Sequence, residues 1–178
     1  MNIREYCNRP GSNVEEMNNV MIARWNAVVS NNDTVYHLGD FAMGKKDRWP
    51  EYRSQLNGRI VFFLGNHDVI PQFLYVLKGE DQWTLDENYV YESPEGIRVS
   101  LAHLPLGHEE SRREGMLIGH RSIGNPVADM YFCGHVHKEW LVDFKTGCVN
   151  VGVDQWNYIP KTLKQIRESL GSVSEMKV

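Results

Sequence analysis

Five polar residues follow short apolar runs of the chain, and each has a side chain that proteins use to hold metal ions. They are Asp40, Asn66, His103, His135 and His137. One carboxylate, one amide oxygen and three imidazoles combine hard oxygen with borderline nitrogen donors, a mixture that suits Mn²⁺, Fe or Zn²⁺ better than Ca²⁺. Because ligands of α/β proteins lie at the carboxyl ends of the strands, residues at these positions can converge although they are far apart in sequence. The pattern predicts a transition-metal site.

Each of these residues also has a simpler explanation when it is taken alone. Asp40 and Asn66 both follow a glycine, and Asp or Asn in a turn commonly bonds to the local backbone. His103 could be a hydrogen-bonded core histidine, whereas His135 and His137 would place both rings on one face of a strand, which is a moderate metal signal. Four separate strand ends that each present a donor are harder to explain in this way, so a shared site is the favoured interpretation.

Residues 109–124 are polar and punctuated by glycine, which predicts a long loop over the site. Arg112, Arg113 and Arg121 in this segment could contact a phosphate group, although a solvated face is the default interpretation for such arginines. For His108, just before the segment, a substrate contact and a plain solvated histidine are equally consistent with the sequence.

Hydrophobic periodicity predicts the elements that must position these residues. A capping box from Ser12 to Glu15 precedes apolar residues at helical spacing, which predicts a helix that ends before residue 31. A weaker helical segment at 47–56 is expected to be interrupted by Pro50, and a helix at 162–170 is expected to end at Gly171. The other predicted elements are strands at 34–38, 60–64, 97–101 and 130–133, a helix at 69–77, and a hairpin formed by 140–144 and 148–153.

Length and composition limit the classes of protein to which the chain can belong. Its 178 residues, 42% of them hydrophobic, suffice for one globular domain with its own core, and 1–178 is interpreted as a single domain. The net charge of −4, without a basic block, argues against tight nonspecific binding of nucleic acid. Three widely spaced cysteines fit a reducing compartment, and no stretch approaches the ~20 apolar residues of a membrane span, so a cytoplasmic protein without membrane contact is expected.

Taken in order, four motifs resemble those of the calcineurin-like metallophosphoesterases. They are Gly39-Asp40, Gly65-Asn66-His67-Asp68, the single His103, and Gly134-His135-Val136-His137. Three further segments resemble a small bacterial and phage subgroup of that family: Tyr6-Cys7-Asn8-Arg9-Pro10, residues 33–41, and Asn150-Val151-Gly152-Val153-Asp154. The resemblance implies an α/β protein built as a layered α/β/β/α sandwich, with mixed sheets flanked by helices.

The same resemblance implies a metal-binding role for each of the five residues. Asp40 resembles the carboxylate that bridges two metal ions, and His137 resembles a ligand of the first ion. Asn66, His103 and His135 resemble the remaining ligands of the second ion. The implied cofactor is a divalent transition metal, with Mn²⁺ preferred over Fe, Zn²⁺ or Ni²⁺, and the family uses two ions.

Catalytic roles also follow from the resemblance. His67 resembles a histidine that is not a ligand but contacts the phosphate and assists the leaving oxygen, and Asp68 would hold its ring. Asn66 would contact the substrate as well as the metal. The implied reaction is hydrolysis of a phosphodiester or phosphomonoester by a metal-bound hydroxide, with a small phosphate ester or nucleotide as substrate.

The sequence departs from the family at one motif. An Asp-x-His at the end of the first strand supplies two ligands of the first metal in the family, but no Asp-x-His occurs here and the first aspartate is Asp33. Only Asp40 and His137 then remain for that ion, fewer than the three protein ligands of a usual catalytic site. We therefore expect the first strand of the sandwich to be absent from this sequence, one ion to be bound, and activity to be impaired.

The sequence is also consistent with two alternatives to a phosphoesterase. The first is a noncatalytic metal- or nucleotide-binding relative that retains one metal site. The second is a structural domain with a single zinc ion held by His135, His137 and one further residue.

Overall fold

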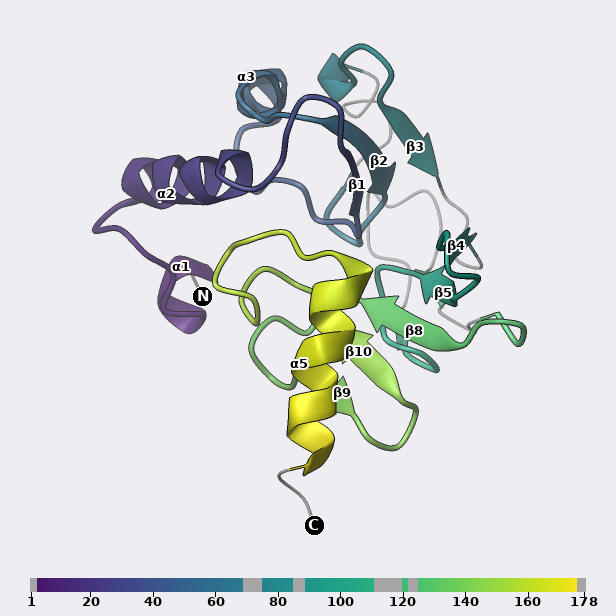
Figure 1. Ribbon diagram of the computed structural model, residues 1–178. Helices are drawn as coiled ribbons and strands as arrows, with labels where there is room; N and C mark the ends of the chain where they lie inside the picture. Colours follow the sequence, from purple (N-terminus) through teal and green to yellow (C-terminus); the bar gives the residue numbers. More distant parts are fainter. Residues whose placement is uncertain (1–2, 69–74, 85–88, 111–119, 122–124, 176–178) are drawn as a thin grey trace.

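A computed structural model describes residues 3–68, 75–84, 89–110, 120–121 and 125–175 of the chain. Its fold is mixed α/β, with a three-stranded sheet, a five-stranded sheet and a small two-stranded sheet (Figure 1). The described elements are α1 (Ile3–Tyr6), α2 (Val14–Asn26), β1 (Thr34–His37), the 3₁₀ helix η1 (Lys46–Arg48), α3 (Trp49–Ser54), β2 (Arg59–Phe63), β3 (Gln82–Thr84), β4 (Tyr89–Glu92), β5 (Arg98–Leu101), β6 (Glu109–Glu110), β7 (His120–Arg121), β8 (Met130–Cys133), β9 (Val142–Asp143), β10 (Cys148–Asn150) and α5 (Leu163–Glu175).

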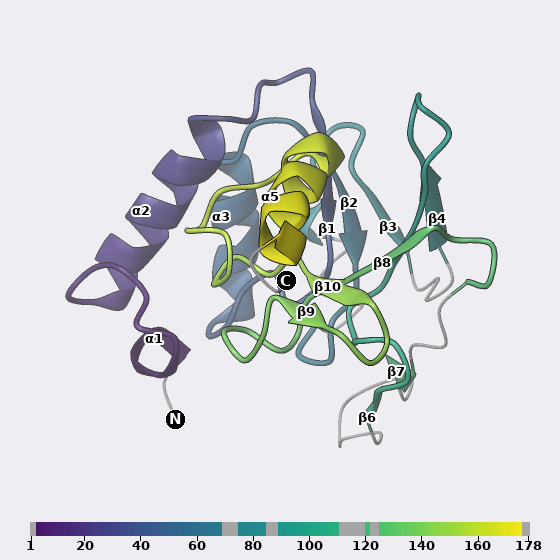
Figure 2. The same ribbon diagram turned by 60° about the horizontal axis from the view of Figure 1, so that its bottom comes forward.

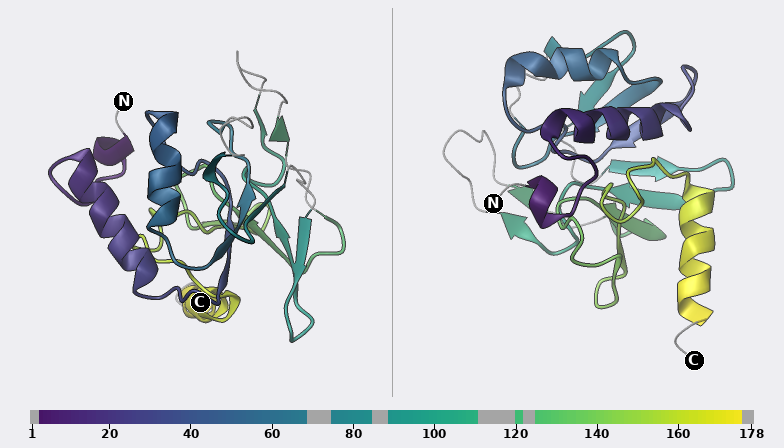
Figure 3. Two further views of the ribbon diagram at one scale, coloured as in Figure 1. Left: turned by 90° about the horizontal axis from the view of Figure 1, so that it is seen from above. Right: turned by 90° about the vertical axis from the view of Figure 1, so that its left-hand side faces the viewer.

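The two larger sheets differ in strand direction. The three-stranded sheet has the order β1-β2-β3 and is parallel throughout. The five-stranded sheet has the order β4-β5-β8-β10-β9, in which β5, β8 and β10 run parallel and the two edge strands run antiparallel. Helices α2 and α3 lie together beside the three-stranded sheet, while α5 lies beside the five-stranded sheet (Figures 2 and 3). This is the layered α/β architecture predicted from the sequence.

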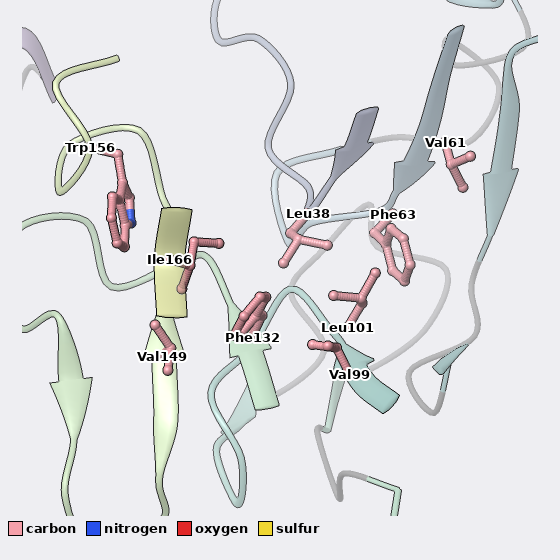
Figure 4. Close-up of a cluster of buried hydrophobic side chains, with 9 residues drawn as sticks. All are labelled: Leu38, Val61, Phe63, Val99, Leu101, Phe132, Val149, Trp156 and Ile166. Carbon is pink, nitrogen blue, oxygen red and sulfur yellow. The ribbon is translucent and has the colours of Figure 1, made fainter. Parts of the chain in front are cut away.

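Strand β2 separates two hydrophobic clusters because its side chains alternate between its faces. Ile60 and Phe62 pack with Trp25 of α2 and Trp49 of α3. Val61 and Phe63 point the other way, and their cluster is completed by residues of β5, β8, β10 and α5 (Figure 4). That second cluster joins the two large sheets; its buried members are Leu38, Val61, Phe63, Val99, Leu101, Phe132, Val149, Trp156 and Ile166. The prediction that residues 60–64 form a strand covered on both faces is confirmed.

Three predicted helix boundaries need correction. The N-cap of α2 is Asn13, whose side chain accepts the Glu16 N–H, so the capping interaction lies one residue later than predicted. Pro50 does not interrupt a helix; it lies in the first turn of α3, where its missing N–H needs no partner. Helix α5 continues through Gly171 to Glu175, since a glycine raises the cost of helix without forbidding it.

Other expectations concern the segments between the strands. The prediction of one long loop at 109–124 needs correction, because β6 and β7 lie in this segment. They pair as antiparallel strands, with Glu109 opposite Arg121 and Glu110 opposite His120. Most of the predicted helix at 69–77 lies outside the described residues. The predicted hairpin is present as β9 and β10. Among the described helices, none is both long enough and apolar enough to cross a lipid bilayer.

Candidate metal centre

Four of the five candidate ligands lie next to one another. His103 Nε2 is 2.9 Å from Asn66 Oδ1 and 3.6 Å from Asp40 Oδ2. His135 Nδ1 is 3.2 Å from the same Asn66 oxygen, and the His103 and His135 rings have centroids 5.2 Å apart. Neighbouring ligands of an ion with bonds of about 2.1 Å are roughly 3 to 3.5 Å apart, so the two histidine–Asn66 separations fit a shared cation, and the Asp40–His103 separation is slightly longer. Asp40 is linked to the group through His103, since the ligand atoms of Asp40, His103 and His135 are not all within 4.8 Å of one another.

The pairing of the strands explains this convergence. Asp40 and Asn66 follow the parallel strands β1 and β2, and His103 and His135 follow the parallel strands β5 and β8. Backbone bonds continue past the last strand residues, because the Gly134 N–H donates to the His103 carbonyl at 3.0 Å. The carboxyl ends of both sheets therefore deliver polar residues to one place, as expected for an α/β protein.

The backbone is strained at three of the candidate ligands. Asp40, His135 and His137 have φ angles of 54°, 65° and 47°, in the left-handed region that residues with a Cβ seldom adopt. Such conformations cost about 1–3 kcal/mol each and persist where the surrounding structure enforces them, often at functional sites. Asp40 lies in the loop after β1, and His135 and His137 lie in the loop after β8.

A backbone carbonyl determines which nitrogen of His103 can serve as a donor to a cation. His103 Nδ1 lies 2.8 Å from the Leu38 carbonyl oxygen, which can only accept, so Nδ1 carries the proton. When the ring is neutral, Nε2 then presents a lone pair toward Asn66 and Asp40. His103 and Asn66 are both buried, with 5% of their surfaces exposed, so water gives these polar atoms little compensation. A bound cation would satisfy the converging acceptors, so the residues present fit a divalent metal.

Glycine is required beside these ligands because two loops touch there. A Cβ at Gly65 would lie 2.2 Å from Asp40 Oδ1 and 2.4 Å from the Asp40 nitrogen. We therefore expect Gly65→Ala to reduce the free energy of unfolding by about 1–3 kcal/mol, as overpacking does, and to weaken cation binding by displacing the carboxylate. Urea unfolding and metal titration would measure the two effects. Gly171→Ala is the control, because nothing lies within 4 Å of its Cβ position and an alanine in α5 should stabilise by up to about 1 kcal/mol.

Asp68 connects the loops that follow β1 and β2. Its Oδ2 accepts the N–H groups of Asp40 at 2.7 Å and Gly65 at 2.8 Å, and its Oδ1 accepts that of Phe41 at 3.2 Å. Burial is the largest influence on this carboxyl group and raises its pKa to about 7, although the backbone N–H donors oppose the shift. Asp68 therefore holds the site's backbone together.

This role differs from the expectation that Asp68 holds the His67 ring. Within the described part of the chain, the carboxylate bonds to backbone groups and no contact with the His67 imidazole is present. The reason is the tight turn, in which Asp68 faces back toward Gly65 while His67 is exposed. His67 is attached to the site through its backbone, since its N–H donates to Asp40 Oδ1 at 2.9 Å.

His137, the fifth candidate ligand, lies in a second group of side chains. Its Nδ1 is 3.1 Å from Asp154 Oδ2, and Asp154 also accepts two hydrogen bonds from Arg9. The donor atoms of Cys7, His137 and Asp154 all lie within 4.8 Å of one another, an arrangement that could hold a metal ion. Burial is the main reason that the pKa of Cys7 is raised to about 11, and nearby Asp154 adds to the shift. Among the described residues, His137 pairs with Asp154, and no hydrogen bond or ion pair joins it to Asp40, the other expected ligand of the first metal.

Comparison with known proteins finds two similar proteins whose names state no activity. The chain is 34% identical over 168 residues to the uncharacterized protein MJ1445 of Methanocaldococcus jannaschii, which covers 93% of this chain and 81% of that protein. The chain belongs to the family of that archaeal protein. No protein-family model matches the sequence. The crystal structure of the protein of unknown function AQ665 from Aquifex aeolicus is similar in fold, with a TM-score of 0.63 and 22% identity, over 94% of this chain and 91% of that one.

Some residues near the candidate ligands were not identified as candidates from the sequence. Cys7 and Arg9 follow no predicted strand, and the sequence indicates them only through the resemblance of their segment to a subgroup. Asp154 directly follows the predicted strand at 148–153, and that position is the signal that marks it as a candidate. His108 is exposed, with its ring centroid 5.4 Å from that of His135, at the edge of the four-residue cluster. Arg112 and Arg113 lie outside the described residues, and of Arg121 only the backbone in β7 is described.

Proposed function

We propose that the protein is a metal-dependent phosphoesterase of the calcineurin-like class, acting on a phosphodiester or phosphomonoester. The observation that carries the proposal is the convergence of Asp40, Asn66, His103 and His135, together with the His103 tautomer that turns acceptor atoms toward one another. Carboxylate, amide and imidazole donors of this kind suit Mn²⁺, and also Fe, Zn²⁺ or Ni²⁺.

In this hydrolysis, residues of the chain would have three separate roles. Asp40, Asn66, His103 and His135 would hold the cation. When bound, such an ion makes water a better nucleophile and neutralises charge that develops on phosphoryl oxygens. His67 is exposed beside Asp40 and is available to donate a proton to the leaving oxygen of a small phosphate ester or nucleotide. Asp68 would contribute by keeping the Asp40 and Gly65 backbones in place.

A noncatalytic relative with one metal site is the second candidate function. It is favoured by the position of His137, which within the described residues contacts Asp154 instead of Asp40. Purified protein assayed with Mn²⁺ against aryl phosphate monoesters, aryl phosphodiesters and cyclic nucleotides separates the two. Hydrolysis that requires Mn²⁺ and disappears with a chelator supports the enzyme, whereas Mn²⁺ binding without hydrolysis of any of these substrates supports the noncatalytic relative.

His67→Ala is expected to slow turnover by about 10²-fold or more, as the loss of a general acid does, with metal content nearly unchanged. The structural reason is that only the backbone N–H of His67 contacts Asp40, and that group survives the substitution. Turnover with an aryl phosphate and metal content by mass spectrometry are the two measurements. An unchanged turnover number would remove His67 from the mechanism, and a parallel loss of metal would make it a ligand.

A further inference from the structure

Asp154 is the centre of a part-buried hydrogen-bond network that has no role in the proposed reaction. Only 2% of its side chain is exposed. Its Oδ1 accepts the Arg9 Nε–H at 2.8 Å, and its Oδ2 accepts the Arg9 Nη2–H at 2.9 Å. This two-point contact joins residues 145 positions apart, and it orients the carboxylate plane because the guanidinium fork is rigid. The same Oδ2 lies 3.1 Å from His137 Nδ1.

This network dictates the state of the His137 ring. Both oxygens of Asp154 accept hydrogen bonds from the Arg9 guanidinium, so its carboxylate faces a fixed positive charge. A carboxylate can only accept, so Nδ1 of His137 must carry the proton. In the neutral ring Nε2 then has the lone pair, and among the described residues this nitrogen has no hydrogen-bond partner. About a third of the His137 side chain is exposed.

The backbone of His137 is held by the same stretch of chain. Its carbonyl accepts the Asn150 Nδ2–H at 2.7 Å and the Gln155 Nε2–H at 3.0 Å. These contacts accompany the left-handed φ of 47° at His137. Residues 150–155 therefore constrain both the ring and the main chain of His137.

We infer that Asp154, clamped by Arg9, is a positioning residue that keeps His137 in the Nδ1–H tautomer and presents Nε2 as a metal ligand. This inference rests on the proposed function for the statement that a cation is bound. Carboxylate or carbonyl partners commonly fix metal-binding histidines in this way. In the four-residue cluster, the Leu38 carbonyl plays the same part for His103, so in both groups an imidazole presents Nε2.

The rival explanation is that Asp154 and Cys7 are themselves ligands, with His137 as the third. The donor atoms of the three residues lie within 4.8 Å of one another, which is close enough for a shared ion. Against this, both oxygens of Asp154 already accept from the Arg9 cation, which would repel a metal ion on the same carboxylate. The geometry favours a supporting carboxylate over a coordinating one.

The decisive measurement is the tautomer of His137, read from long-range ¹H–¹⁵N correlations of the metal-free chain at a pH where the ring is neutral. We expect Nδ1–H in the natural protein and a shift toward Nε2–H in Asp154→Asn, because the amide can turn its N–H₂ group toward Nδ1. Asp129→Asn is the matched control, since Asp129 also pairs with an arginine, Arg98, on the surface. A His137 tautomer that is unchanged in Asp154→Asn overturns the inference.

The ring of His103 serves as a control in the same spectrum. His103 should remain Nδ1–H in every variant, because its partner is a backbone carbonyl. Where Asp154→Asn disturbs both rings, the milder Arg9→Lys, which keeps the positive charge but loses the two-point contact, replaces it. Because the Asp154 carboxylate remains in Arg9→Lys, His137 should stay Nδ1–H there while the affinity for Mn²⁺ falls, and an unchanged affinity counts against the clamp.

Cation binding tests the second half of the inference. Loss of a supporting carboxylate typically costs 10- to 100-fold in metal affinity, so we expect a loss of that size for Mn²⁺ in Asp154→Asn. A shifted tautomer with unchanged affinity would show that His137 is not a ligand, and would leave the proposed function resting on the other four residues. With Co²⁺ as probe, a thiolate charge-transfer band that is lost in Cys7→Ser would establish the rival ligand set. Absence of hydrolysis would defeat the proposed function without altering the tautomer result.

Discussion

Asp40→Asn is expected to weaken Mn²⁺ binding at least about a hundredfold and to abolish hydrolysis. Asp40 supplies the negative charge of the four-residue cluster, whose other members are an amide and two imidazoles. Removing one unit charge about 4 Å from another costs about 4 kcal/mol at an effective dielectric of 20, and a ligand lies closer to a divalent ion than that. Calorimetric titration with Mn²⁺ would measure the affinity.

The fold should survive this substitution. Asparagine keeps a carbonyl oxygen that can accept the His67 N–H, and the Asp40 N–H remains free to donate to Asp68. Asp129→Asn again serves as the control, because it removes an exposed carboxylate that is not part of the cluster. Equal Mn²⁺ affinity in Asp40→Asn and in the natural protein, with both folded, would show that the cluster is not the cation site.

The largest expected effect on stability comes from Arg53→Met. The Arg53 guanidinium, 2% exposed, forms two hydrogen bonds to Asp81 at 2.6 and 2.7 Å and two more to the Leu56 and Gly58 carbonyls. Asp81 also accepts the Ile60 N–H at 2.8 Å. Removing the cation leaves a buried carboxylate without its counter-ion, which typically costs 3–5 kcal/mol. Urea unfolding would measure the free-energy change.

Heating provides an independent check on Arg53→Met. For a chain of this size, 1 kcal/mol corresponds to about 2–4 °C in Tm, so a decrease of roughly 6–20 °C is expected. The control is Arg98→Met, which breaks the half-exposed pair with Asp129 and should change stability by less than about 1 kcal/mol. Similar losses in the two variants would mean that burial adds little to the importance of the Arg53 pair.

Local sequence was sufficient for the strands that lead to the site and for the four residues of the cluster, but it did not predict α1, β3 or β4. Apolar runs that end abruptly in Gly39-Asp40 or Gly134-His135 mark strand ends, and parallel strands must bring those ends to one edge. The helix boundaries were less predictable, because neighbouring residues can compete to cap the same helix end. Asn13 and Ser12 are both able to cap α2. Pro50 is tolerated because it lies in the first turn of α3, and Gly171 lies within α5 without ending it.

Residue types and spacing thus determined the layered α/β fold, the strands that lead to the site and the donors that follow them. The partners of those donors depended on the folded arrangement. Arg9 meets Asp154 across 145 residues, and Asp154, not Asp40, contacts His137. Asp68 turns toward three backbone N–H groups instead of the adjacent His67. Periodicity indicates which face a side chain occupies, whereas a hydrogen bond requires two atoms within about 3 Å, and the packing of distant loops sets that distance.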